Sequence, residues 1–135
     1  MDEKELRELT KKTSQMLFHT VKGGVGFSTW RQFDNDLARK LSTFITGHLY
    51  SREVISHKQR ELCAVASLTV LLRGAELRAH LHAALNVGAT REEISEVIFQ
   101  QVTYGGMPVV SDALFNFKEV LIERGEWSES APPTS

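Results

Sequence analysis

The feature of this sequence that most constrains its fold is a helical period that continues through almost the whole chain. Only three of the 135 residues are proline, and two of these lie near the C-terminus, so long stretches contain no residue that breaks a helix. Within them, apolar side chains recur at steps of three and four, and we find no alternation typical of a strand. The pattern predicts an all-α protein of about six helices joined by short links.

Capping and breaking residues set the expected limits of these helices. Ser56 followed by Gln59, and Thr90 followed by Glu93, are capping-box patterns that begin a helix. Ser28 or Thr29 is expected to cap the second helix. Glycines end several others, and Gly47 is expected to end the second. The expected helices cover about residues 2–20, 30–46, 56–72, 75–87, 90–102 and 108–124, with a glycine-rich link at 22–26, a break near Gly74 and a break or kink at 104–108.

This spacing divides the chain into three parts. Residues 1–28 are expected to form an N-terminal helix and a glycine-rich linker, residues 29–125 the main helical domain, and residues 126–135 a flexible tail. A chain of 135 residues fits one domain and is long enough to bury a core without a disulfide or a metal.

The composition excludes several classes of protein. Sixteen basic and 17 acidic residues give a net charge of −1, without the basic excess of a nucleic-acid-binding module. The N-terminus is charged from its second residue, unlike a signal peptide, and no apolar run approaches the roughly 20 residues of a membrane span. These features predict a soluble, cytoplasmic protein. The single cysteine, Cys63, excludes an intrachain disulfide and is expected to be a buried structural thiol.

Two motifs suggest chemistry that their context does not support. The Gly24-Val25-Gly26 cluster has no preceding strand and no following Gly-Lys-Ser/Thr, so a linker is expected rather than a phosphate loop. His80 and His82 lie two residues apart on a helix and point in nearly opposite directions, so they cannot share a metal. His80 lies beside the apolar stripe, whereas His82 is expected to be solvated. No metal site and no organic cofactor are predicted.

Glu61 and His80 each allow two interpretations from spacing alone. Glu61 lies at the edge of the buried stripe of its helix and next to basic residues, so it belongs either to a charged first turn or to a site. His80 has Glu76 one turn before it, a spacing that is more often a surface ion pair than a metal site. On this evidence Glu61 and His80 are either ordinary helix-edge residues or a catalytic pair.

Three segments together resemble the carboxymuconolactone decarboxylase family: RELCAVA at 60–66, ELRAHLHAALNVGATREEISEV at 76–97 and QQVTYGGMP at 100–108. The resemblance covers about residues 29–124. It implies an all-helical, alkylhydroperoxidase D-like subunit in a homo-oligomer, most often a hexamer, with a site between helices and no cofactor or metal. The decarboxylase branch of the family converts 4-carboxymuconolactone to 3-oxoadipate enol-lactone and CO2 in the catabolism of aromatic compounds.

The resemblance also implies roles for individual residues. In the related alkylhydroperoxidase D proteins, a glutamate, a CxxC pair and a histidine form a relay. Glu61 and His80 match the glutamate and the histidine, whereas Arg73 and Glu76 occupy the positions of the two cysteines. Without a dithiol, peroxide reduction by that route has no electron carrier. The resemblance therefore implies that Glu61 and His80 are catalytic, with His80 donating a proton to carbon.

A small carboxylate is the implied substrate, and further residues are expected to bind it. An arginine can hold a carboxylate through two hydrogen bonds, and Arg60, Arg73 and Arg78 are the candidates. The expected substrate-binding residues are Arg73, Glu76, Gln101 and Tyr104. Two alternatives stay open: a redox protein that uses Cys63 with an external thiol, and a non-catalytic, oligomeric binding protein.

Overall fold

The structure of the chain is a computed structural model that describes residues 1–23 and 26–130. The described residues form helices and connecting segments without a strand, which confirms the predicted all-α class. The elements are α1 (Glu3–Phe18), α2 (Ser28–Phe33), α3 (Asn35–Ser42), the π-helix η1 (Thr43–Leu49), α4 (His57–Val70), α5 (Gly74–Asn86), α6 (Arg91–Gln100), α7 (Val102–Gly105) and α8 (Met107–Glu123).

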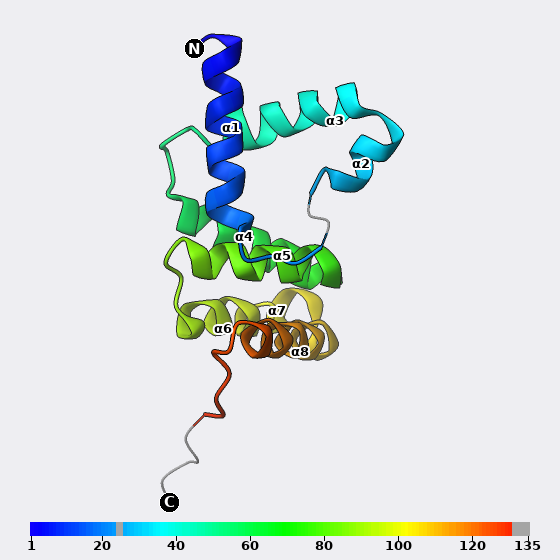
Figure 1. The fold of residues 1–135 in the computed structure, drawn as a ribbon. Helices are drawn as coiled ribbons and strands as arrows, with labels where there is room; N and C mark the ends of the chain where they lie inside the picture. The colour runs from blue at the N-terminus through cyan, green and yellow to red at the C-terminus, as the bar shows by residue number, and fades with distance from the viewer. Residues whose placement is uncertain (24–25, 131–135) are drawn as a thin grey trace, which may run out of the picture.

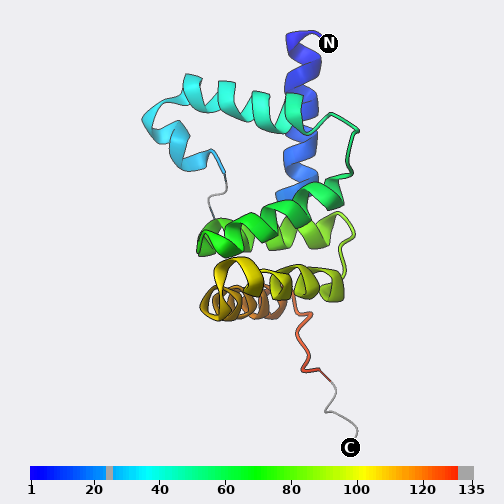
Figure 2. The ribbon, with the colours of Figure 1, turned by 180° about the vertical axis from the view of Figure 1, so that it is seen from behind.

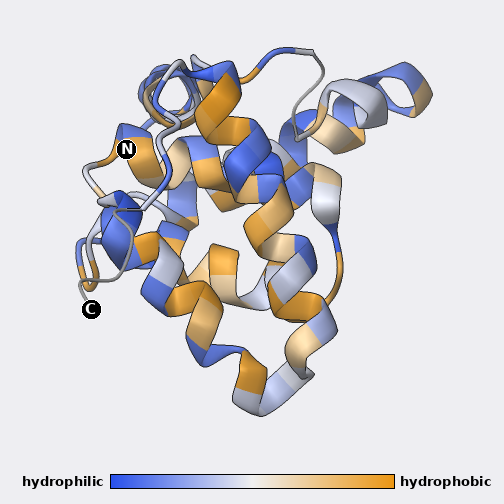
Figure 3. Cartoon of the chain, turned by 90° about the horizontal axis from the view of Figure 1, so that it is seen from below, coloured by the Kyte–Doolittle hydropathy of each residue, from blue (hydrophilic) through white to orange (hydrophobic). Residues whose placement is uncertain are grey.

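The helices form two layers with an N-terminal extension. Helices α4 and α5 lie side by side in the middle of the molecule, and α6, α7 and α8 form a layer against them (Figures 1 and 2). Helix α1 packs end-on against the α4–α5 layer, and α2 and α3 extend to one side of α1. The helices carry apolar and polar residues interspersed along their length (Figure 3). The core between the layers consists of Val65, Leu77, Leu81, Ala84, Ala89, Ile94, Ile98, Val109, Val110, Ala113, Phe117, Val120 and Leu121.

Local signals placed several helix boundaries correctly. Both predicted capping boxes are present, with Ser56 accepting from the Gln59 amide at 3.1 Å and Thr90 from the Glu93 amide at 3.0 Å. The expected break before the last helix is also present. Gly106 has a φ of 87°, and this left-handed conformation, which favours glycine, separates the short helix α7 from α8.

The predicted helix over 30–46 is not continuous. Asp34 adopts an extended conformation and accepts a hydrogen bond from the Leu37 amide at 2.9 Å, so it ends α2 and caps α3. Ser28 is already helical, and α2 has no side-chain cap. Gly47 lies inside η1 rather than at a helix end. A Cβ atom there would clash with Thr10 and Leu6 of α1, so close packing of η1 on α1 explains this glycine.

The break between α4 and α5 begins earlier than expected. Helix α4 ends at Val70, and Leu72, the last residue of the helix expected over 56–72, is exposed with a φ of 55°. Gly74 is the first residue of α5 and not part of the break.

Part of the C-terminal tail lies against the helical domain. The Trp127 ring packs against the guanidinium of Arg91 at 4.8 Å and the ammonium of Lys118 at 5.0 Å. Arg91 also donates to the Ser128 carbonyl at 2.6 Å. Residues 131–135 and Gly24–Val25 lie outside the described residues, so the flexibility expected of 126–135 and the linker role of the glycine cluster remain predictions. None of the described helices is long and apolar enough to span a membrane.

Candidate functional site

The structure brings Glu61 and His80 into direct contact. Glu61 lies in the second turn of α4 and His80 in the second turn of α5, and the two helices pack side by side. Oε2 of Glu61 lies 2.6 Å from Nδ1 of His80. The Glu61 side chain is fully buried, whereas that of His80 is 24% exposed. A carboxylate that accepts the Nδ1–H bond fixes the imidazole tautomer and leaves Nε2 free for a proton transfer.

The second oxygen of Glu61 is the unusual part of this pair. Oε1 is buried and has no hydrogen-bond partner among the described residues. A buried acceptor without a partner is costly, the more so on a charged group, and such atoms are uncommon in folded proteins. Glu61 shares its helix face with the buried Val65 and Thr69, where an apolar side chain would ordinarily be expected. Burying this carboxylate costs free energy that an apolar side chain at the same position would not cost, and buried ionisable groups of this kind are concentrated at functional sites.

Tyr50 is a third member of the cluster, and sequence reasoning missed it. Its ring lies 5.5 Å from the guanidinium carbon of Arg60 and 6.2 Å from the His57 ring. Residues 57, 60 and 61 share one face of α4 because they are three and four residues apart, so Tyr50 lies over the face that carries Glu61. Burial, and then the charge of Glu61, raises the pKa of Tyr50 to about 12.

The polar atoms around Tyr50 are incompletely paired. Nδ1 of His57 and Nε of Arg60 are buried without a hydrogen-bond partner among the residues that the structure describes. Another nitrogen of Arg60 donates to the Arg52 carbonyl at 2.8 Å. Tyr50 lies between the helices expected over 30–46 and 56–72, and nothing in the sequence around it connects it to Glu61, 11 positions later.

Helix α1 covers the exposed side of the pair. The ring of Phe18, at the end of α1, lies edge-on against the ring of His80, with centroids 5.4 Å apart and planes at 89°. Such an edge-to-face arrangement stabilises an aromatic pair. Phe18 therefore limits access of solvent to His80 from this direction.

The four expected substrate-binding residues are spread over the fold. Arg73 immediately precedes α5, and Glu76, in its first turn, lies one turn before His80; both are exposed. Gln101, between α6 and α7, is buried and donates to the Val97 carbonyl of α6 at 2.9 Å. Tyr104 on α7 is 69% exposed. Within the described part of the chain, no hydrogen bond or ion pair joins any of the four to the pair, so their binding roles remain predictions.

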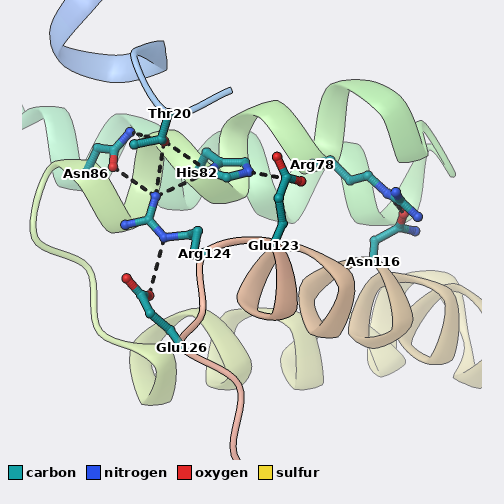
Figure 4. Close-up of polar contacts among 8 residues, drawn as sticks. All are labelled: Thr20, Arg78, His82, Asn86, Asn116, Glu123, Arg124 and Glu126. Atoms are coloured by element: carbon teal, nitrogen blue, oxygen red, sulfur yellow. Dashed lines mark hydrogen bonds and ion pairs between the residues drawn. The ribbon is translucent and has the colours of Figure 1, made fainter. Parts of the chain in front are cut away.

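Of the other two arginine candidates, Arg60 lies in the cluster and Arg78 does not. The Arg60 guanidinium packs on Tyr50, as described above. Nε of Arg78 donates to Oδ1 of Asn116 at 2.6 Å, which joins α5 to α8 (Figure 4). Arg78 therefore has a structural partner away from the pair.

The prediction that His82 is solvated is wrong. It points away from His80, as its spacing requires, but the end of α1 and the end of α8 cover that face, and its side chain is 3% exposed. Nδ1 lies 3.0 Å from the Thr20 hydroxyl, and Arg124 donates to Thr20 at 3.1 Å and to Asn86 at 3.0 Å (Figure 4). Nε2 lies 3.7 Å from Glu123. Burial lowers the pKa of His82.

The prediction that Cys63 is buried is also wrong, because its side chain is exposed. It follows Glu61 by two residues, so it projects from the other side of α4. The described residues contain no cluster of three His, Cys, Asp or Glu side chains able to hold a metal ion.

Glu61 and His80 lie in a part of the chain that matches a known protein family. The sequence model of the carboxymuconolactone decarboxylase family matches residues 35–119, from α3 to α8. The chain belongs to the carboxymuconolactone decarboxylase family. It is 34% identical over 93 residues to a 4-carboxymuconolactone decarboxylase of Acinetobacter baylyi, which is 69% of each chain. It is 37% identical over 82 residues to an uncharacterized 15.0 kDa protein from the nqo9–nqo10 intergenic region of Paracoccus denitrificans, covering 59% of this chain and 61% of that protein. The matched range includes both residues of the pair.

Proposed function

We propose that this member of the family is a decarboxylase of a small carboxylated lactone, with 4-carboxymuconolactone as the first substrate to test. The observation that carries the proposal is the 2.6 Å contact between the buried Glu61 carboxylate and Nδ1 of His80. This arrangement suits a proton transfer. The name of the Acinetobacter relative supplies the substrate.

The proposed reaction requires one proton at carbon. The bond to the carboxylate carbon breaks, CO2 leaves, and the electron pair stays on the substrate, where the conjugated lactone delocalises it. Protonated His80 donates a proton from Nε2 to carbon, and the enol-lactone forms. Glu61 holds Nδ1 and stabilises the imidazolium before the transfer. His80 then recovers its proton from water, so the net change is loss of CO2 and gain of one proton at carbon.

A redox function through Cys63 is the second candidate, and its support is the exposure of the thiol. Cys63 and the pair lie on different sides of α4, so the thiol would have to act without the glutamate and histidine. The positions of a dithiol hold Arg73 and Glu76 instead. The decarboxylase proposal uses the buried pair, and the redox alternative leaves it without a role.

We propose further that the chain forms a closed homo-oligomer, with a hexamer as the expected size. The support is apolar surface on α2, α3 and η1: Phe33 is 88%, Phe44 58% and Leu37 45% exposed. Large apolar side chains exposed to this extent on neighbouring elements are consistent with an interface between subunits. Analytical ultracentrifugation would measure the mass, and a monomer at micromolar concentration would contradict the proposal. Phe33→Glu should lower the mass, whereas Lys12→Glu, on the exposed side of α1, should leave it unchanged.

The decisive experiment compares two activities of one preparation. Loss of the lactone is followed by ultraviolet absorbance, and thiol-dependent peroxide consumption is measured in parallel. The proposal expects lactone turnover that survives Cys63→Ala and is strongly reduced in His80→Gln. Peroxide consumption that requires Cys63, with no lactone turnover, would favour the redox alternative. If the preparation shows neither activity, the non-catalytic binding function is the remaining explanation.

A further inference from the structure

A cavity of about 510 Å³ lies between α1, α2 and α3, within the range of small-molecule sites. Its walls carry basic, hydroxyl and aromatic side chains and no acidic one. The lining residues are Arg7, Thr10, Lys11, Ser14, Gln15, Phe18, His19, Arg31, Arg39, Ser42 and Thr43. A chain with a net charge of −1 thus gathers basic groups around one hollow, which attracts anions.

The charge balance of the cavity indicates how many negative charges a ligand would carry. Two of its permanent cations are matched by acids outside the lining. Arg7 pairs with Glu3 at 2.6 Å, and Arg39 pairs with Asp36 at 3.1 Å. Lys11 and Arg31 form no ion pair within the described part of the chain. Two cations therefore face the cavity without a compensating charge.

The cavity extends toward the candidate catalytic pair. Arg7, Lys11, Ser14 and Phe18 follow one another at steps of three and four, so they form a row along one face of α1. The row ends at Phe18, whose ring packs edge-on against His80 at 5.4 Å between centroids. An anion bound between Lys11 and Arg31 would therefore lie on the same side of the molecule as the exposed edge of His80.

We propose that this cavity binds a small organic dianion, with Lys11 and Arg31 each holding one carboxylate group. Lys11 supplies an ammonium on α1, and Arg31 supplies a planar guanidinium on α2 that can hold a carboxylate by two hydrogen bonds. The hydroxyl groups of Ser14 and Ser42 provide further donors in the walls. That this dianion is the substrate rests on the proposed function; that the cavity binds it does not.

The test is a calorimetric titration at one low ionic strength, because salt screens exposed charges. The two probes are trans,trans-hexa-2,4-dienedioate and trans,trans-hexa-2,4-dienoate, which share the same conjugated chain and differ by one carboxylate. We expect the dicarboxylate to bind at least tenfold more tightly than the monocarboxylate. Lys11→Gln and Arg31→Gln should each weaken dicarboxylate binding about tenfold, since one carboxylate group of the probe loses its cationic partner.

Lys12→Gln is the matched control, because Lys12 is the next residue on α1 but does not line the cavity. It should bind the dicarboxylate as the unmodified protein does. Equal affinity for the two probes, or unchanged binding in the Lys11→Gln, Arg31→Gln double variant, would overturn the proposal. An equal loss of dicarboxylate affinity in the Lys12→Gln control would also overturn it, because the effect would then come from the net charge of the protein and not from the cavity.

A kinetic measurement separates this proposal from the proposed function. If the dianion is the substrate, the double variant should raise KM for the lactone about a hundredfold and leave kcat nearly unchanged, because Lys11 and Arg31 act in binding only. Dicarboxylate binding that needs Lys11 and Arg31 but no lactone turnover would contradict the proposed function and support the site. Lactone turnover with an unchanged KM in the double variant would support the proposed function and show that the substrate does not bind through Lys11 and Arg31.

Discussion

The Phe18 ring at the end of α1 lies edge-on against the His80 ring on α5, with centroids 5.4 Å apart. Phe18 lies outside residues 35–119, the range that matches the family. The N-terminal helix therefore packs against the candidate catalytic pair, which itself lies in the family region. Members of the family with different N-terminal segments should differ here, so this segment is a place to look for substrate selectivity.

Replacing His80 tests the proton donor. His80→Gln keeps a group that can donate to Glu61, so the buried carboxylate keeps a partner and the fold should persist. Turnover of the lactone should fall by about 10²–10⁴-fold, the usual contribution of a positioned general acid. Glu61→Gln should cost less if Glu61 only orients the ring. His48→Ala, at an exposed histidine on η1, is the control, and His82 is unsuitable because it is buried. Full activity in His80→Gln would exclude His80 as the donor.

The two tyrosines allow a direct measurement of the charge on Glu61. In a Tyr104→Phe variant only Tyr50 titrates, and its pKa should lie near 12, because burial and the carboxylate of Glu61 both disfavour the tyrosinate. Adding Glu61→Gln removes the negative charge but not the burial, so the pKa should fall part of the way toward its ordinary value of 10.0. Ultraviolet difference absorbance against pH measures both values. An unchanged pKa would show that Glu61 does not act on Tyr50.

His82 should make the protein less stable in mild acid. Burial lowers the pKa of His82 in the folded chain below its ordinary value of 6.5, so the unfolded chain binds the proton more tightly. The stability that neutral His82 provides is therefore present above pH 6.5 and is lost as the pH falls through and below that value. Thermal unfolding at pH 5 and at pH 7.5 would show the difference.

A variant at the same position is the matched test. His82→Gln removes the titrating group, so it should make the pH dependence smaller. Because Thr20 and Arg124 lose their shared partner, it should also lower the free energy of unfolding at neutral pH by about 1–3 kcal/mol. An unchanged slope of stability with pH would assign that dependence to other groups.

Cys63→Ala should change little. The side chain is exposed, so no packed site is emptied, and the free energy of unfolding should stay within about 0.5 kcal/mol of the original value. Denaturant unfolding under reducing conditions measures this. A loss of several kcal/mol would mean that packing between subunits buries the thiol in the assembled protein. A matched Ser67→Ala variant, on the same exposed side of α4, would then lose stability as well.

Much of the fold follows from local signals that the sequence carries by itself. Ser56, Thr90 and Gly106 act on amides or dihedral angles within a few residues, so their effect does not depend on the rest of the chain. The helical period of the later segments is also visible in the structure, where residues spaced along it, such as Leu77, Leu81 and Ile94, are buried. The helix over 30–46 was predicted incorrectly, because the Asp34 side chain binds the Leu37 amide and interrupts the helix. The spacing of apolar residues contains no sign of this interruption.

The tertiary structure decided which side chains meet. Glu61 and His80 are 19 residues apart. Helix spacing could not predict whether their side chains touch, and the contact forms because α4 packs against α5. Tyr50 joined them because η1 returns the chain to the start of α4, and His82 was buried because α1 and α8 close over a face that its own helix leaves open. Such contacts depend on how whole elements pack. A local pattern fixes the direction of a side chain around its own helix axis, but not what lies in that direction.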